Sequence, residues 1–173
     1  MRYAAIALAA LAALSLATGA HASEGSVSFD AGVVSTYVWR GLALTDGPAF
    51  QPGMTVTAGT VSANIWANQD LDDVNGSEAE YTELDYTFDW TFPVGEKVAV
   101  SIGAIQYTFP NTVFGITSEV YLGAAFDVVL APSITLYRDI EATGGLYGSL
   151  GLGHSVGMPA EGSLDIGLAI GFG

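Results

Sequence analysis

Hydrophobic and polar residues alternate one by one over the segment 81–92. The hydrophobic members are Leu84, Tyr86, Phe88, Trp90 and Phe92, and the polar members are Glu83, Asp85, Thr87, Asp89 and Thr91. A β-strand places successive side chains on opposite faces, whereas a helix would spread both kinds around its whole circumference. The segment therefore predicts a strand with one face in an apolar medium and the other face in water.

The same alternation recurs along the chain and predicts an all-β fold with nine strands in total. The other eight predicted strands are 26–40, 53–58, 61–68, 97–109, 116–130, 133–140, 145–155 and 163–172. The first of them is longer than the five or six residues, roughly, of an ordinary globular strand. Its length suits a tilted membrane strand of about 9–11 residues with polar rims.

The predicted connections alternate in length. The segments 41–52, 69–79 and 110–115 are long and polar, whereas those after the second, fourth and sixth strands are short. Outer-membrane barrels have short periplasmic turns and long extracellular loops. We therefore expect an antiparallel, up-and-down transmembrane β-barrel. Because bacterial barrels have even strand numbers, we expect the nine strands to belong to a barrel of 10–12 strands that is truncated at its C-terminus.

The N-terminus carries the features of a secretory signal. Arg2 precedes an apolar run from Ala4 to Thr18, and Ala20-His21-Ala22 has the small residues that signal peptidase requires. The run is shorter than the roughly 20 residues that a membrane-spanning helix needs. We expect a signal peptide over residues 1–22, a barrel domain over residues 23–173 and a location in the bacterial outer membrane.

Charge and cysteine content exclude several classes of protein. The chain has 18 acidic and four basic residues, and removal of Arg2 with the signal peptide would leave a net charge of 3 − 18 = −15. Nucleic-acid binding requires Lys and Arg to neutralise phosphates, so it is excluded. The chain has no cysteine, which excludes a disulfide scaffold and thiol catalysis.

No catalytic constellation is evident, so we expect neither enzymatic activity nor a cofactor. The two histidines are His21, in the signal peptide, and His154, on a Gly-rich strand. A single histidine without a nucleophile and an orienting group does not make a triad. Glu83 and Asp85 are two residues apart on one strand face, about 7 Å by strand rise, as any lining of a barrel would place them.

The acidic loop 69–79 is a weak candidate for a metal site. Asp70, Asp72 and Asp73 offer the carboxylate oxygens that calcium prefers. The spacing does not fit an EF-hand, because Val74 occupies the fifth position from Asp70 and no glutamate stands at the twelfth. A solvated loop is the favoured interpretation.

The segment 35–41, with the sequence STYVWRG, is followed by Thr45-Asp46-Gly47-Pro48. This motif resembles the hallmark of the TorF-type porin family, a group of Gram-negative envelope proteins of largely uncharacterised function. The matching positions are Ser35, Tyr37, Trp39, Arg40, Gly41 and Thr45. The resemblance covers about the first half of the mature chain and implies a β-barrel of the outer membrane.

With the apolar faces toward lipid, acidic residues would line the interior. The predicted lining residues are Asp30, Glu83, Asp85, Asp89, Glu119 and Asp127, with Arg40 and Arg138 as the basic candidates. Excess carboxylates in a pore attract cations and repel anions. We expect a passive pore for cations or small solutes that lies among membrane lipid and lipopolysaccharide.

Two other functions remain open at this point. The chain could form a closed structural or adhesive barrel whose loops, chiefly 69–79, bind a partner or divalent ions that bridge lipopolysaccharide. It could also be a soluble periplasmic β-sandwich that binds a ligand, because the inside of a sandwich is an apolar medium as well.

Overall fold

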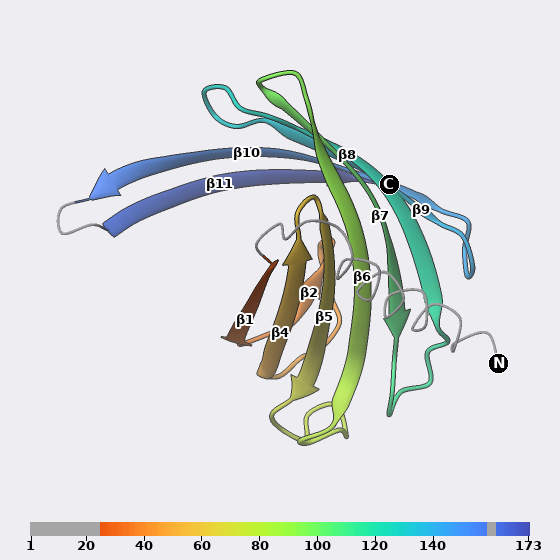
Figure 1. The fold of residues 1–173 in the computed structure, drawn as a ribbon. Helices are drawn as coiled ribbons and strands as arrows, with labels where there is room; N and C mark the ends of the chain where they lie inside the picture. Colours follow the sequence, from red (N-terminus) through yellow and green to blue (C-terminus); the bar gives the residue numbers. More distant parts are fainter. Residues whose placement is uncertain (1–24, 159–161) are drawn as a thin grey trace. The chain divides into compact units, whose positions relative to one another are not determined.

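The computed structural model describes residues 25–158 and 162–173, and the predicted signal peptide over 1–22 lies outside the described residues. The described chain is all-β. Nine strands form one sheet in the order β1-β4-β5-β6-β7-β8-β9-β10-β11, and β2 and β3 pair separately (Figure 1). Among the described residues, no helix is both long enough and apolar enough to cross a membrane.

The strands of the large sheet are antiparallel in every pairing that we describe below. The bounds are β1 (Gly25–Val34), β2 (Val38–Trp39), β3 (Leu42–Ala43), β4 (Ala49–Ala58), β5 (Val61–Asp70), β6 (Tyr81–Val94), β7 (Val98–Thr108), β8 (Thr117–Phe126), β9 (Ser133–Asp139), β10 (Leu146–Met158) and β11 (Gly162–Phe172).

The prediction of nine long antiparallel strands is confirmed, and the segment 81–92 lies in β6 as expected. The expected closure into a barrel is not observed, because the strand order ends at β1 and β11 and their described residues do not pair with each other.

Two predicted strands are shorter than expected. The first ends at Val34, not at residue 40, because Arg40 and Gly41 have φ values of 50° and 84° and form a two-residue turn between β2 and β3. Such a turn needs positive φ at both central residues. The sixth ends at Phe126, not at residue 130, because Leu130 and Ala131 also have positive φ values and the chain turns there. The second, in contrast, begins earlier, at Ala49.

The chain divides into two compact units, which we describe separately. Unit 1 comprises the described residues up to Asp89 together with Tyr107–Phe114, and unit 2 comprises Trp90–Gln106 and the described residues from Gly115 onwards.

In unit 1, the register of β1, β4 and β5 separates a polar face from an apolar face. Asp30 pairs with Gly53, which pairs with Trp66, and Ser28, Thr55 and Asn64 pair in the same way. The intervening residues of β1 therefore project from the other face. They include Val27, Phe29 and Val33, all of which are exposed.

In unit 2, β8 to β11 divide in the same way. Leu122 pairs with Leu136 on the apolar face, while Tyr121, Tyr137 and Tyr147 form a row on the opposite face, with ring centroids 5.5 and 5.9 Å apart. The apolar face continues onto β11. Its exposed residues there are Leu164, Ile166, Leu168, Ile170 and Phe172.

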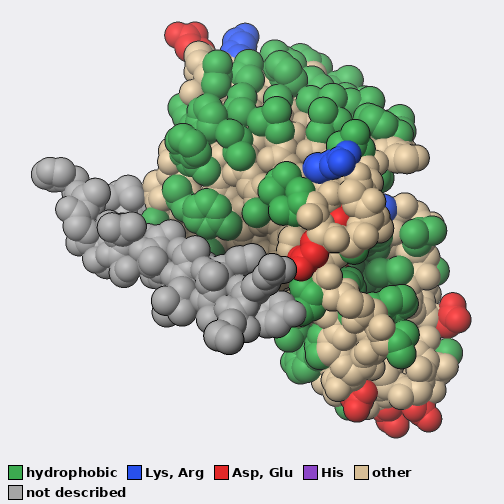
Figure 2. All heavy atoms as spheres, turned by 90° about the vertical axis from the view of Figure 1, so that its right-hand side faces the viewer, with side chains coloured by type: hydrophobic (Ala, Val, Ile, Leu, Met, Phe, Trp, Pro, Cys, Tyr) green, Lys and Arg blue, Asp and Glu red, His purple; other side chains and the backbone are tan. Residues whose placement is uncertain are grey.

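Burial in the described residues is the reverse of that in a water-soluble domain, where large apolar side chains are the most often buried. The buried hydrophobic residues are Tyr37, Ala49, Ala67 and Tyr107, and the buried polar or charged residues are Thr45, Asn68, Asp70, Ser77, Glu83, Glu119 and Asp139. Phe29, in contrast, is 76% exposed. Figure 2 shows hydrophobic side chains spread over much of the surface that it draws.

One close contact fixes the packing of the last two strands in unit 2. The ring of Tyr147 lies over Gly171, where an added Cβ atom would meet the Tyr147 hydroxyl and would lie 2.8 Å from its Cζ atom. Gly167, on the same face of β11, has only Leu152 O at 3.7 Å from such a Cβ atom. Glycine at position 171 therefore makes room for the tyrosine.

We predict that Gly171→Ala lowers the free energy of unfolding by about 1–3 kcal/mol, because an added methyl group must displace the tyrosine ring from its packed position. The matched control is Gly167→Ala, which adds the same methyl group in ordinary van der Waals contact. Urea unfolding of the purified protein measures both. Equal unfolding midpoints for the two variants would contradict the role assigned to Gly171.

Candidate functional site

The segment between β1 and β4 carries the hairpin of β2 and β3. Its base is held by backbone and side-chain hydrogen bonds around Tyr37. The Tyr37 N–H donates to Thr45 Oγ1 at 3.1 Å, the Leu44 N–H donates to Tyr37 O at 2.8 Å, and Thr45 Oγ1 donates to Gly47 O at 3.3 Å. These hydrogen bonds therefore fix the conformation of the chain at the base of the hairpin.

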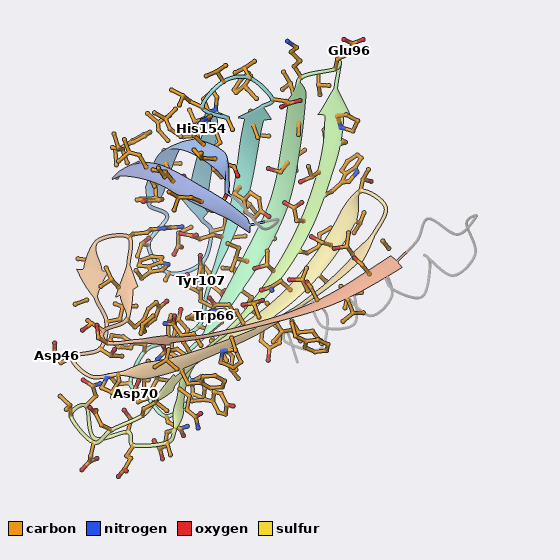
Figure 3. The ribbon with its side chains drawn as sticks, turned by 90° about the vertical axis from the view of Figure 1, so that its left-hand side faces the viewer. Asp46, Trp66, Asp70, Glu96, Tyr107 and His154 are labelled. Atoms are coloured by element: carbon orange, nitrogen blue, oxygen red, sulfur yellow. The ribbon has the colours of Figure 1, made fainter. Side chains whose placement is uncertain are left out.

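Two aromatic contacts place this hairpin on the polar face of unit 1. The Tyr37 ring lies 5.4 Å from the ring of Trp66 on β5, and the Trp39 ring lies 6.1 Å from the ring of Tyr107 on β7. The Tyr37 hydroxyl donates a hydrogen bond to the carboxylate of Glu83 on β6. Trp66 and Tyr107 are labelled in Figure 3. The segment therefore covers part of the polar face of β5, β6 and β7.

Electrostatics around Tyr37 follow from this placement. Tyr37 is only 9% exposed. Burial, the negative charge of Glu83 and the hydrogen bond to Glu83 together hold the pKa of the Tyr37 hydroxyl well above its usual range. Asp85 acts in the same direction. The hydroxyl therefore stays protonated at neutral pH and donates to the carboxylate.

We define the aromatic–carboxylate cluster as Tyr37, Trp39, Trp66, Glu83, Asp85 and Tyr107. All six residues belong to unit 1. Arg40 adjoins the cluster, because its guanidinium Cζ lies 4.4 Å from the centroid of the Trp39 ring. This distance is within the range of a cation–π interaction.

Asp70, at the end of β5, organises the loop that precedes β6. Its side chain is 1% exposed and accepts hydrogen bonds from Ser77 Oγ at 2.5 Å, from Asn68 Nδ2 and Asn75 Nδ2 at 3.2 Å each, and from Thr82 Oγ1 at 3.4 Å. Protein donors therefore surround both carboxylate oxygens. Asp70 is a structural residue that holds the loop 71–80.

The predicted metal candidates Asp70, Asp72 and Asp73 do not converge. Asp72 Oδ1 accepts from the Val74 N–H at 3.1 Å, and Asp73 is exposed. In the part of the chain that the structure describes, no group of three or more His, Cys, Asp or Glu side chains is arranged to hold a metal ion.

Asp139, at the end of β9 in unit 2, plays a similar part. Its Oδ1 atom accepts hydrogen bonds from the backbone N–H groups of residues 141–144 at 2.9–3.3 Å, and its Oδ2 atom accepts from Thr117 Oγ1 at 2.7 Å. Burial alone would raise the pKa of Asp139, but these hydrogen bonds outweigh it and hold the pKa well below its usual range. Sequence reasoning missed this residue, although an aspartate before a Gly-containing turn is a typical loop cap.

The structure places five of the predicted lining residues on polar strand faces. Glu83, Asp85 and Asp89 alternate with the exposed Tyr86, Phe88 and Trp90 on β6. Asp30 lies against Gly53 on the polar face of β1 and β4, where a Cβ atom would be 2.6 Å from its Oδ2. Glu119 is buried on β8.

The other three predicted lining residues lie elsewhere. Arg138 shares the apolar face of β9 with Ile134 and Leu136, because Asp139 turns its side chain to the polar face and the neighbouring residue must point the other way. Asp127 follows the end of β8, where its N–H donates to Lys97 O at 2.8 Å. Arg40 lies in the hairpin turn and not on a strand of the large sheet.

We predict that Asp139→Ala destabilises the protein by about 1–3 kcal/mol at neutral pH, because several loop N–H groups lose their acceptor. Since the folded pKa lies below the unfolded value of about 3.9, the carboxylate stabilises the fold above that value and this contribution is lost as the pH falls through the folded pKa. The difference between wild type and variant should therefore shrink below about pH 4. Urea unfolding at several pH values measures it, with Glu96→Ala in the exposed turn before β7 as the control. A difference that stays constant from pH 7 to pH 2 would contradict the assignment.

Comparison with known proteins places the chain in a family. No curated protein and no solved structure shows significant similarity to it. The model of a family described as "Bacterial protein of unknown function (Gcw_chp)" matches residues 18–148, well over half of the 173 residues. The match includes β1 to β9 and all six residues of the aromatic–carboxylate cluster. The chain therefore belongs to the Gcw_chp family of bacterial proteins.

Proposed function

We propose that this protein resides in the bacterial outer membrane as a β-barrel and lets cations or small solutes pass along its acidic polar face. The observation that carries the proposal is the burial pattern of the described strands, in which large apolar side chains are exposed on one face and several polar side chains are buried on the other. The resemblance of residues 35–48 to TorF-type porins supports the same function.

The exposed apolar face needs a medium other than water. Soluble monomers rarely expose a continuous apolar patch larger than a few hundred Å². Exposed apolar residues lie on one face of β8, β9 and β11 in unit 2, among them Leu122, Leu136 and Leu168. A bilayer accommodates this face without any rearrangement, whereas a soluble sandwich would require a second layer over it.

The proposed membrane form also needs more strands than the nine described. An open sheet edge is untenable in hydrocarbon. Bacterial barrels of this kind have an even number of strands. A barrel of 10 or 12 strands has an interior only slightly wider than the side-chain-filled interior of about eight strands, which suits ions or small solutes.

Cation preference follows from the charges on the polar face. The carboxylates of Asp30, Glu83, Asp85, Asp89 and Glu119 lie on polar strand faces, whereas Arg138 lies on an apolar face. A path between low-dielectric walls focuses the field of such carboxylates. The path attracts cations and repels anions.

A closed barrel that acts through its loops is the second candidate. The buried Asp70 and Asp139 each fix a loop, 71–80 and 140–145 respectively, with several hydrogen bonds. Each ordered loop offers a binding surface of its own even if no solute passes.

We predict that the Trp90 side chain contacts lipid. Trp90 is 47% exposed on the apolar face of β6, whereas Trp39 and Trp66 belong to the aromatic–carboxylate cluster. In vesicles whose acyl chains carry bromine, the fluorescence of a Trp39→Phe/Trp66→Phe variant should be strongly quenched. The matched control is Trp90→Phe, whose two remaining tryptophans should be quenched far less. Absence of quenching in both variants would favour the soluble sandwich.

We predict that neutralising carboxylates on the polar face reduces cation preference. In planar bilayers with a salt gradient, the wild type should show discrete steps with a cation-selective reversal potential, because the acidic face stabilises cations. Asp30→Asn/Asp89→Asn should move the reversal potential toward zero. Glu78→Gln/Glu96→Gln removes the same charge from exposed loop positions and should change it little. A heat-modifiable, inserted protein that conducts no current would favour the closed barrel.

A further inference from the structure

We propose that the aromatic–carboxylate cluster is a recognition site for organic monocations, of the quaternary ammonium or guanidinium type, and that Arg40 is its built-in competitor. The inference rests on the proposed function in one respect, because it names the class of cation that the acidic face prefers. The binding itself requires no membrane and is tested without one.

The cluster brings together residues that are far apart in the sequence. Tyr37 and Trp39 come from the segment between β1 and β4, Trp66 from β5, Glu83 and Asp85 from β6, and Tyr107 from β7. Trp66 packs on Tyr37 and Tyr37 donates to Glu83, while Trp39 packs on Tyr107.

The carboxyl pair supplies the charge of the site. Glu83 is 4% exposed, and its side chain shares a hydrogen bond with that of Asp85. Both side chains lie on the polar face of β6, where they give the site its negative character. A cation is their electrostatic complement.

The aromatic rings supply the selectivity for organic cations. Ring faces attract cations whose centres lie within about 6 Å, and the attraction is stronger where water is excluded. Tyr37 and Tyr107 are buried, and Trp39 and Trp66 are half-buried. Hard metal ions prefer oxygen ligands, whereas the ring faces of this cluster favour organic cations.

Arg40 shows that one ring of the cluster, that of Trp39, already contacts an organic cation. Its guanidinium lies over the Trp39 ring at 4.4 Å from the centroid. Arg40 stands on a turn in which it and Gly41 have positive φ values. The guanidinium is therefore carried to the edge of the cluster by the hairpin, where it occupies a ring face that a free cation would use.

The first experiment measures binding of choline to the protein in detergent. The Trp90→Phe variant restricts the fluorescence to Trp39 and Trp66, since the chain has three tryptophans. Titration with choline chloride, at constant ionic strength maintained with NaCl, should give a saturable change in fluorescence. The neutral isostere 3,3-dimethylbutan-1-ol has the same shape without the charge and should give none.

Substitutions in the Trp90→Phe background then assign the roles. Arg40→Gln should tighten choline binding several-fold, because the competitor is removed. Glu83→Gln should weaken it by about tenfold, the size expected for loss of a partly desolvated charge interaction. Asp89→Asn is the matched control, because Asp89 lies six residues from Glu83 on the same strand, about 20 Å by strand rise, and its variant should bind as the parent does.

Three results would overturn the inference: no saturable response in either the parent or the Arg40→Gln variant, an equal response to the neutral isostere, or binding that Arg40→Gln leaves unchanged or weakens. If Glu83→Gln loses heat-modifiable migration, Asp85→Asn replaces it and should also weaken binding. If the protein binds choline but conducts no current, the proposed pore is refuted and the recognition site is not. Normal cation selectivity without choline binding would refute the recognition site alone.

Discussion

The alternation of side chains across a strand is the constraint on which this structure depends. Because successive residues point to opposite faces, each strand of the large sheet can carry an apolar face and a polar face. Phe88 and Trp90 face outwards on β6, while Asp85 and Asp89 lie on the other face. Backbone hydrogen bonds join each strand of this sheet to the next.

Polar groups that are buried on such a sheet must find partners within the protein. Three segments between strands answer this need in different ways. Asp70 and Asp139 gather donors from the loops that follow them, and Tyr37 brings a hydroxyl to Glu83 while its own backbone is bonded at the base of the hairpin. The loops are thus extensions of the polar face, and their conformations are fixed by the carboxylates that they cover.

Sequence reasoning located the strands well, because period-two alternation is a local property: residues 81–92 needed only their neighbours for a correct prediction. It failed where contacts between distant residues decide the conformation. Tyr37 was expected to project from the first strand with Trp39, but its contacts with Trp66 and Glu83 draw it onto the polar face. The cluster itself could not be predicted, because its members span residues 37–107 and no spacing rule connects them.

The close fit of the Tyr147 ring over Gly171 also restricts the register in which β10 and β11 can pair. In the observed register, Gly171 pairs with Ser149, and the Tyr147 ring fits over the glycine. A slip of β11 by one residue would bring Ile170 or Phe172 beneath the ring and would also send the apolar residues of β11 to the polar face. The Tyr147 ring and Gly171 therefore favour a single register of β10 and β11. In that register, the apolar residues of β11 lie together on one face of the sheet.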